Sequence, residues 1–229
     1  MLESGEVISY REMCDAERAS LQRGMNYKHH GAESVLLMSV RSGAPYHDRV
    51  EDDGRVLIYE GHDVKRTQAR DPKTADQPMC EPSGKLTQNG QFWEAAQRFQ
   101  TGKSDAEIVR VYEKIKTGIW VFNGLFRLVD ARQEESGGRK VFKFRLELGS
   151  SDLPREPRSL SLEHHRVIPS AVKVEVWKRD KGRCVKCGSG DNLHFDHVIP
   201  FSRGGTSLMG KNIQLLCARH NLEKRDRVE

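Results

Sequence analysis

The chain has 229 residues, of which 31% are charged and 7% are aromatic, and its formal net charge is +5 at pH 7. This length allows one large domain or two modest ones, and the composition is that of a globular protein without a bias toward disorder. The first residues are acidic and lack an apolar stretch, and apolar runs such as Val35 to Met38 are far too short to cross a membrane. We therefore expect a cytoplasmic protein with no membrane partner.

The N-terminal two thirds of the chain predict an α+β domain with a strand-rich core. Helical spacing of apolar residues favours helices at residues 12–25 and 91–99. A capping box at Ser104 to Glu107 predicts a further amphipathic helix through Ile108, Val111, Tyr112 and Ile115. Short apolar or alternating runs predict the strands, which are residues 34–41, 56–59, 119–129 and 140–148.

The sequence divides near residue 155. Residues 149–159 contain two prolines and three serines with little apolar content, which is typical of a linker. We expect one domain at residues 1–155, with the linker near 149–160, and a second domain at residues 161–229. The positive charge lies in the second part, because residues 151–229 hold 15 Lys and Arg against 10 Asp and Glu, whereas residues 1–150 hold 23 of each. Such an excess suits contact with nucleic-acid phosphates, although it also describes an ordinary solvated surface.

Three of the five cysteines lie close together near the C-terminus. Cys184-x-x-Cys187 and Cys217-x-x-His220 each place two ligands at the spacing that grips one ion, and two such pairs complete the tetrahedron of a structural zinc site. A domain this small has little core, so bound Zn²⁺ would supply much of its folding free energy. The other two cysteines, Cys14 and Cys80, have no partner at such a spacing and are interpreted as ordinary thiols.

Three sequence blocks lie around and between the zinc pairs, namely Leu193 to Pro200, Ser202 to Gly205 and Lys211 to Cys217. With these blocks, residues 177–224 resemble the HNH endonuclease family. The resemblance implies a small zinc-stabilised ββα-metal fold, in which Asp196 and His197 are the family's Asp-His pair and Asn212 is its central Asn. Asn221 falls at the last ligand position, which is often His in the family.

These residue types suit the hydrolysis of a phosphodiester bond. Neutral His197 can act as a general base, because the pKa of an imidazole lies near neutrality. Asp196 and Asn221 offer oxygen ligands to a catalytic Mg²⁺ or Mn²⁺, which would bind the phosphate and the leaving oxygen. Asn212 is expected to support catalysis by holding the loop and the His197 ring rather than by touching the metal. The alternatives are a purely structural Asp-His pair and an Asn221 that caps a helix end.

Three further basic residues are candidates for phosphate contacts. His194 lies two residues before Asp196 on the same strand face, and Arg203 and Lys224 lie in or near the same blocks. For His194 the alternative is an ordinary strand histidine, and for the other two it is a solvated side chain.

A second resemblance rests on three blocks of the N-terminal part, namely Ser39 to Gly61, Lys85 to Asn89 and Phe122 to Gly124. They resemble the SRA (YDG) domain family, whose modules read modified cytosine by flipping it out of the duplex. The resemblance covers roughly residues 30–150 in scattered blocks. The third block stands where the family has Tyr-Asp-Gly, so the signature is altered in this chain.

A flipped cytosine needs aromatic faces for stacking and a carboxylate that accepts from its amino group. The resemblance places Tyr46 and Tyr59 at the positions of the family's two pocket tyrosines and Asp48 as the carboxylate, although Arg49 takes that position in another alignment. The alternative is that both tyrosines are core residues and Asp48 caps a turn. A methyl-sized space beside such a pocket would favour 5-methylcytosine or 5-hydroxymethylcytosine.

Taken with both resemblances, the sequence predicts a modification-dependent restriction endonuclease that acts on double-stranded DNA containing modified cytosine. Cutting both strands needs two active sites, so a homodimer is expected. Two alternatives remain open. One is a reader that binds modified DNA without cleaving it, and the other is a sequence-specific HNH nicking or homing enzyme that ignores modification.

Overall fold

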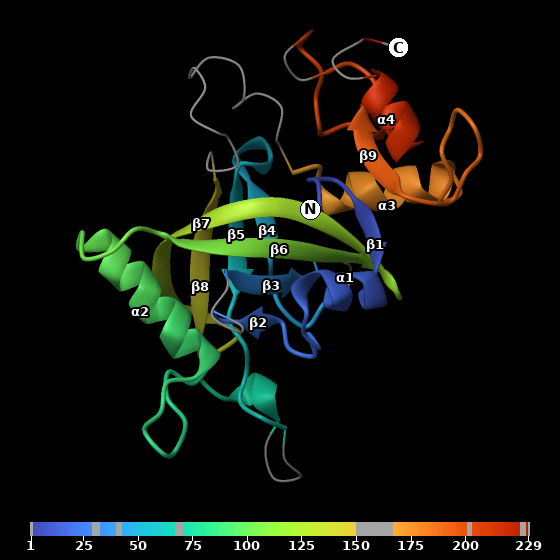
Figure 1. Ribbon diagram of the computed structural model, residues 1–229. Coiled ribbons are helices and arrows are strands. Elements are labelled where there is room, and N and C mark those ends of the chain that lie inside the picture. The colour runs from blue at the N-terminus through green and yellow to red at the C-terminus, as the bar shows by residue number, and fades with distance from the viewer. Residues whose placement is uncertain are drawn as a thin grey trace.

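The computed structural model describes residues 2–28, 33–39, 43–66, 71–149, 167–200, 203–224 and 228. Within these residues, eight strands form one large curved sheet in the N-terminal domain and two strands form a small sheet in the C-terminal domain (Figure 1). The strands are β1 Val7–Ser9, β2 Met25–Asn26, β3 Ser34–Met38, β4 Arg49–Glu51, β5 Val56–Glu60, β6 Glu107–Lys116, β7 Ile119–Ser136, β8 Arg139–Leu148, β9 Leu193–His197 and β10 Ile213–Cys217. The helices are α1 Tyr10–Glu17, α2 Gln88–Gln100, α3 Ser170–Arg179 and α4 Ala218–Lys224. None of the described helices has the length and hydropathy needed to cross a membrane.

The large sheet has the strand order β2-β3-β6-β7-β8-β5-β4, and β1 also pairs with β7. Strands β3 and β6 run parallel, and the other described pairs are antiparallel. Helix α2 packs on this sheet, where Phe92 and Phe144 are fully buried with their ring centroids 5.8 Å apart. The α+β, strand-rich prediction is confirmed, and so are the predicted helix at residues 91–99 and the strands at residues 56–59, 119–129 and 140–148. Of the strand predicted at residues 34–41, β3 takes up residues 34–38, and residues 40 and 41 lie outside the described residues.

Two predicted helices are corrected by the structure. The segment after Ser104 forms strand β6 rather than an amphipathic helix, because β6 pairs with β3 on one side and β7 on the other. Its β-branched residues fit a buried pleated strand, so tertiary pairing outweighs the local capping signal. The helix predicted at residues 12–25 is the shorter α1, which begins after the cap Ser9 and ends before Arg18, where the backbone turns to a φ of 50°.

The predicted domain boundary near residue 155 falls outside the described residues, as does all of the linker near 149–160 except Gly149. The division into residues 1–155 and 161–229 therefore stays a prediction.

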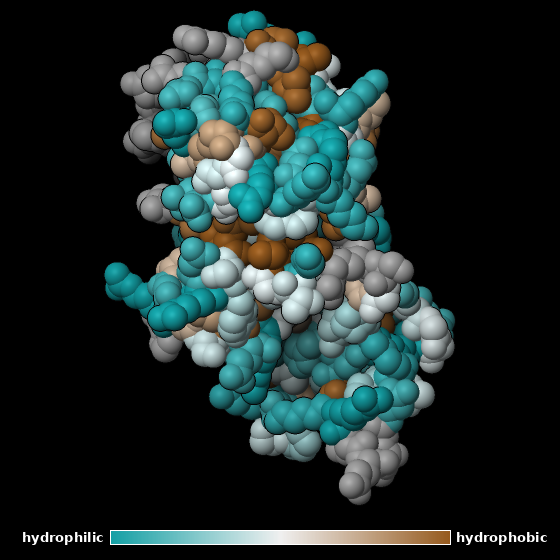
Figure 2. Space-filling model, turned by 90° about the vertical axis from the view of Figure 1, so that its right-hand side faces the viewer, coloured by the Kyte–Doolittle hydropathy of each residue, from teal (hydrophilic) through white to brown (hydrophobic). Residues whose placement is uncertain are grey.

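The two domains meet along the N-terminal segment and the end of the β6–β7 hairpin. The carbonyl oxygen of Gly5 accepts a hydrogen bond from Phe195 N in β9 at 3.1 Å, and Gly5 N donates to Phe122 O in β7 at 2.8 Å. Ile115 and Val121 of the hairpin share one hydrophobic core with α3, β9 and β10. Figure 2 shows hydrophobic side chains as a band at the level where the C-terminal domain meets the large sheet.

A buried charged group crosses the same junction. Lys173 of α3 places its Nζ 2.7 Å from Glu113 Oε2 in β6 and 2.6 Å from Asn123 Oδ1 in β7. Asn123 Nδ2 also donates to Glu113 Oε2 at 3.0 Å. The exposed fractions are 1% for Lys173, 0% for Glu113 and 3% for Asn123, so water does not solvate this pair.

Gly54 makes a further contact at the junction and provides a test of it. Gly54 has a φ of 89° and accepts a hydrogen bond from Val167 N at 3.2 Å, and an added Cβ would lie 2.3 Å from Val167 O. Gly84 has a similar φ of 83° with nothing within 4 Å of its Cβ position, so Gly84→Ala is a matched control. Both substitutions carry the positive-φ penalty of about 1–2 kcal/mol. Gly54→Ala should lower the free energy of unfolding, measured in denaturant, by about 1–2 kcal/mol more, because the backbone must shift. Equal losses would show that this contact does not form.

Candidate nuclease centre and base pocket

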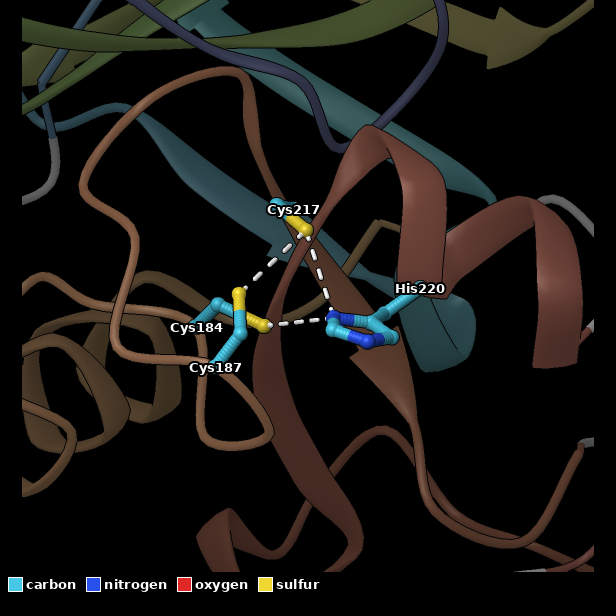
Figure 3. A group of neighbouring side chains, drawn as sticks. All are labelled: Cys184, Cys187, Cys217 and His220. Atoms are coloured by element: carbon cyan, nitrogen blue, oxygen red, sulfur yellow. Dashed lines mark hydrogen bonds between the residues drawn. The ribbon is translucent and has the colours of Figure 1, made fainter.

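Cys184, Cys187, Cys217 and His220 converge on one point of the C-terminal domain (Figure 3). Their ligand atoms all lie within 4.8 Å of one another. Cys187 Sγ is 3.8 Å from Cys217 Sγ, and His220 Nδ1 is 3.3 Å from Cys184 Sγ and 3.4 Å from Cys217 Sγ. Zn–S bonds of about 2.3 Å in a tetrahedron give S···S edges of about 3.8 Å. The four residues predicted as ligands therefore lie together, and their donors fit a zinc ion.

Local structure explains why these ligands converge. Cys184 and Cys187 lie in a turn in which Gly188 N donates to Cys184 O at 2.8 Å, while Cys217 ends β10 and His220 lies in the first turns of α4. Burial alone would raise the pKa of the Cys184 thiol, but hydrogen bonds from backbone N–H groups, that of Cys217 first, lower it to about 6. Because the thiolate is the form that binds zinc, this backbone arrangement favours metal binding.

The Asp-His pair lies at the C-terminal end of β9. Asp196 Oδ2 is buried, makes no described hydrogen bond and lies 2.7 Å from the ammonium of Lys224. His197 Nε2 is 2.8 Å from Ser207 Oγ. Burial lowers the pKa of His197 below its ordinary value, which favours the neutral imidazole that a general base requires.

Asn212 and Asn221, also predicted for this centre, lie in different elements. Asn212 is 7% exposed and bonds both backbone groups of Ile199 as well as Thr206 O, so it fixes the loop after β9. Asn221 lies half-buried in the middle of α4 rather than at a helix end.

The three candidate phosphate contacts also differ from one another. His194 is buried in β9 at 6% exposure, and Lys224, at 2% exposure, binds Asp196 instead of facing solvent. Arg203 is exposed, so of the three it is the one whose side chain can reach a phosphate without a rearrangement.

A cavity of about 550 Å³ opens in the N-terminal domain and brings Tyr46, Asp48 and Tyr59 together. This volume lies within the range of small-molecule sites. Tyr10 and Trp120 also line the cavity, which makes its wall rich in aromatic side chains. Arg23 and Lys114 line it as well and add positive charge.

Asp48 is the buried carboxylate of this cavity. Its Oδ1 accepts a hydrogen bond from Glu60 N at 2.9 Å and its Oδ2 accepts one from Ser39 N at 3.3 Å. Burial raises the pKa of Asp48 to about 7, because the backbone bonds offset the loss of water only in part. Arg49, which takes the carboxylate position in the other alignment, is exposed and pairs with Glu51 at 2.6 Å.

Comparison with known proteins assigns both parts of the chain. The SAD/SRA domain family matches residues 3–149, which is more than half of the chain, and the HNH endonuclease family matches residues 184–227. The chain belongs to the SAD/SRA domain family. Its C-terminal part is an HNH endonuclease domain.

Solved SRA-containing structures resemble the chain more loosely. They include the SUVH5 SRA domain with fully methylated CG DNA, which is 26% identical, covers 69% of this chain and 95% of its own and has a TM-score of 0.45. The same domain bound to fully hydroxymethylated CG DNA is 27% identical at the same coverage, with a TM-score of 0.46. SUVH6 of Arabidopsis thaliana is 21% identical over 86% of this chain and 32% of its own, with a TM-score of 0.43. No curated protein sequence matches the chain. Because these TM-scores are below 0.5, the family assignment rests on the matches of residues 3–149 and 184–227.

The other two SRA blocks have structural positions away from the cavity. In the block from Lys85, Thr87 Oγ1 caps α2 by accepting from Gly90 N, and the buried Asn89 bonds both backbone groups of His62 after β5. In the block from Phe122, Asn123 faces Glu113 and Lys173 at the domain junction.

Sequence patterns did not identify several residues of these sites. The sequence pattern marks Trp120 only as part of a strand, and Ser207, which contacts His197, carries no motif signal. Lys173 had a signal that could have been used, because Ser170, Lys173 and Val176 follow the buried face of α3 at helical spacing. A lysine on such a face predicts a buried acidic partner.

Removal of one zinc ligand tests the metal assignment. Cys217→Ser should lose the one bound zinc and lower the melting temperature by roughly 10 °C or more, because a structural zinc contributes several kcal/mol to folding. The measurement is metal content by elemental analysis together with thermal unfolding. Cys80→Ser is the control, because Cys80 is exposed and lies away from the cluster. Full zinc content and an unchanged melting temperature in Cys217→Ser would exclude this cluster as the metal site.

Proposed function

We propose that the protein is a modification-dependent DNA endonuclease, in which the SRA domain binds an extruded 5-methylcytosine or 5-hydroxymethylcytosine and the HNH domain hydrolyses a nearby phosphodiester bond. The observation that carries this proposal is the pairing, in one chain, of an aromatic cavity around Asp48 with an Asp-His pair beside a Cys₃His cluster. The solved SUVH5 SRA domains were crystallised with methylated and hydroxymethylated DNA, which is consistent with this substrate class.

In the cavity, the proposed ligand is the cytosine ring. The faces of Tyr46 and Tyr59 would stack on it, and the Asp48 carboxylate would accept a hydrogen bond from its exocyclic amino group. The position of the Tyr46 ring is stabilised by Lys73, whose Nζ lies 4.2 Å from the ring centroid and pairs with Asp63 at 2.9 Å. Asp63 in turn pairs with Arg139 at 2.6 Å.

In the nuclease centre, His197 would take the proton of the attacking water. Ser207 occupies Nε2 of this imidazole, so Nδ1 is the nitrogen proposed as the proton acceptor. Lys224 lies against Asp196 Oδ2, which leaves Oδ1 and the side-chain oxygen of Asn221 as the proposed ligands of Mg²⁺ or Mn²⁺. A divalent ion bound there would supply charge stabilisation to the phosphate and the leaving oxygen.

Paired digests test this function. Plasmid carrying methylated cytosine should be cut in Mg²⁺ or Mn²⁺, and the same plasmid without modification should stay intact. His197→Ala should lower the cleavage rate at least about 100-fold, which is the lower range for loss of a general base, and should still bind the modified plasmid.

Each other outcome of the digest points to a different protein. Equal cutting of both plasmids would refute the dependence on modification and favour a sequence-specific HNH enzyme. Binding without cutting by the unaltered protein would favour a non-cleaving reader, the alternative to which the Lys224–Asp196 ion pair lends support. A homodimer remains the proposed assembly for cutting both strands.

The pH dependence of binding tests the role of Asp48. In the free protein the carboxyl has a pKa of about 7, and an acceptor for the cytosine amino group must be ionised, so binding should release a proton. Affinity for modified duplex should therefore rise roughly tenfold from pH 6 to pH 8, as the ionised fraction of a group of pKa 7 does. The free energy of unfolding should instead fall as the pH rises. The pKa of the Asp48 carboxyl is higher in the folded protein, so its protonated form stabilises the folded state. That contribution is complete below the pKa of the unfolded chain and is lost as the pH rises through about 7.

The control for this titration is Asp48→Asn, whose binding should not change over the same pH range. Other charged or titratable groups of the described residues face the carboxyl or line the cavity, and these are Glu60, Lys143, Tyr46, Tyr59, Tyr10, Arg23 and Lys114. A rise that persists in Asp48→Asn would assign it to one of them. Affinity that falls as the pH rises would instead indicate a protonated Asp48 that donates to the base.

A further inference from the structure

The end of the β6–β7 hairpin serves two sites at once. Successive side chains of a strand point to opposite faces of its sheet. In β6, Lys114 lines the base cavity whereas its neighbours Glu113 and Ile115 face the HNH domain. In β7, Trp120 lines the cavity and Val121 packs in the core shared with α3 and β9. The proposed base site and the nuclease domain thus lie on opposite faces of one pair of strands.

Strand β1 provides a second connection between the same two places. Its residues pair with β7, with Ile8 opposite Trp120. At one end the segment continues into Tyr10, which lines the cavity. At the other end Gly5 bonds the backbone of Phe195, the residue before Asp196. At about 3.3 Å per extended residue, the five steps from Gly5 to Tyr10 span roughly 17 Å.

Lys173 connects the HNH domain to the β6–β7 hairpin through buried polar contacts. Its ammonium is enclosed by Glu113 Oε2 and Asn123 Oδ1, one from each strand of the hairpin. A buried ammonium is stable only while its partners stay in place, so sliding or rotation of α3 over the hairpin would strand a charge away from water. Apolar packing alone has no such directional requirement, and the pair therefore selects one arrangement of the two domains.

We propose that the β6–β7 hairpin, β1 and the Lys173–Glu113–Asn123 group form a rigid bridge that fixes the position of the HNH centre relative to the base cavity, so that the cut falls at a set distance from the modified cytosine. Lys173 is a positioning residue in this scheme and touches neither base nor phosphate. The inference rests on the proposed function, which it deepens by assigning the determinant of the cut position. It also predicts that the two domains move as one body in the absence of DNA.

The first experiment maps cut positions on a duplex with a single 5-methylcytosine and a label on either strand. The unaltered full-length protein should cut at one or two adjacent bonds on each strand. Lys173→Met should spread the cuts over several neighbouring bonds, while binding of the duplex changes less than about threefold, since the cavity residues are untouched. The double variant Lys173→Met/Glu113→Gln removes the stranded carboxylate and should fold better, yet should keep the spread because the directional pair is gone.

A second variant tests the β1 connection independently. Gly5 has a φ of 87°, and an added Cβ would lie 3.0 Å from Phe195 O, so Gly5→Ala should also broaden the cut positions. Gly102→Ala is the matched control, because its φ of 68° carries a similar strain with nothing within 4 Å. It should leave the narrow pattern unchanged.

Broad cutting by the unaltered protein, or an equally narrow pattern in Lys173→Met and its double variant, would overturn the bridge. Small-angle X-ray scattering of the free proteins separates this failure from failure of the proposed function. If no DNA is cut at all, a larger radius of gyration in Lys173→Met than in the unaltered protein still supports the bridge. An identical radius of gyration in the two proteins overturns it.

Discussion

The buried ammonium of Lys173 and its two partners join the two domains of the molecule. Lys173 comes from the HNH domain, and Glu113 and Asn123 come from neighbouring strands of the SRA sheet. Removing any one of them leaves a polar or charged group in a place that water does not reach. The surrounding core of Ile115, Val121 and the residues of α3, β9 and β10 supplies apolar burial, while the ion pair determines how the surfaces are aligned. Stability and geometry at the junction therefore have different physical sources.

Because side chains alternate between the two faces of a strand, one hairpin contributes residues to two different sites. One face of β6 and β7 forms part of a cavity with an aromatic wall, and the opposite face receives a second domain. Buried ionisable groups lie at both places, namely Asp48 in the cavity and Glu113 with Lys173 at the junction. Asp48 meets the loss of water by a shift of its pKa to about 7, whereas Glu113 meets it by pairing. This difference fits their proposed roles, in which Asp48 binds a ligand and Glu113 stabilises the domain junction.

Sequence reasoning reached those sites whose residues are close together in the chain. The two C-x-x-C/H pairs required only a spacing rule, and the structure brings their four ligand atoms within 4.8 Å. Asp196 and His197 are adjacent, so their common location was never in question. Tyr46, Asp48 and Tyr59 were placed by resemblance, and their convergence in one cavity depends on β4 and β5 pairing. Lys173 and Glu113 are separated by 60 residues, and no local pattern pairs them. The strand β6 was mistaken for a helix for the same reason, because its identity depends on β3 and β7 rather than on its own first turn.

In the proposed complex, one chain holds a modified base in the SRA cavity while its HNH centre meets the backbone of the same duplex. The most direct test is a crystal structure of His197→Ala bound to a duplex with one 5-methylcytosine. We expect the modified base outside the helix, between Tyr46 and Tyr59 with its amino group on Asp48, and a phosphate beside Asp196. A base that remains stacked in the duplex, with the cavity empty and the HNH centre away from the DNA, would contradict it.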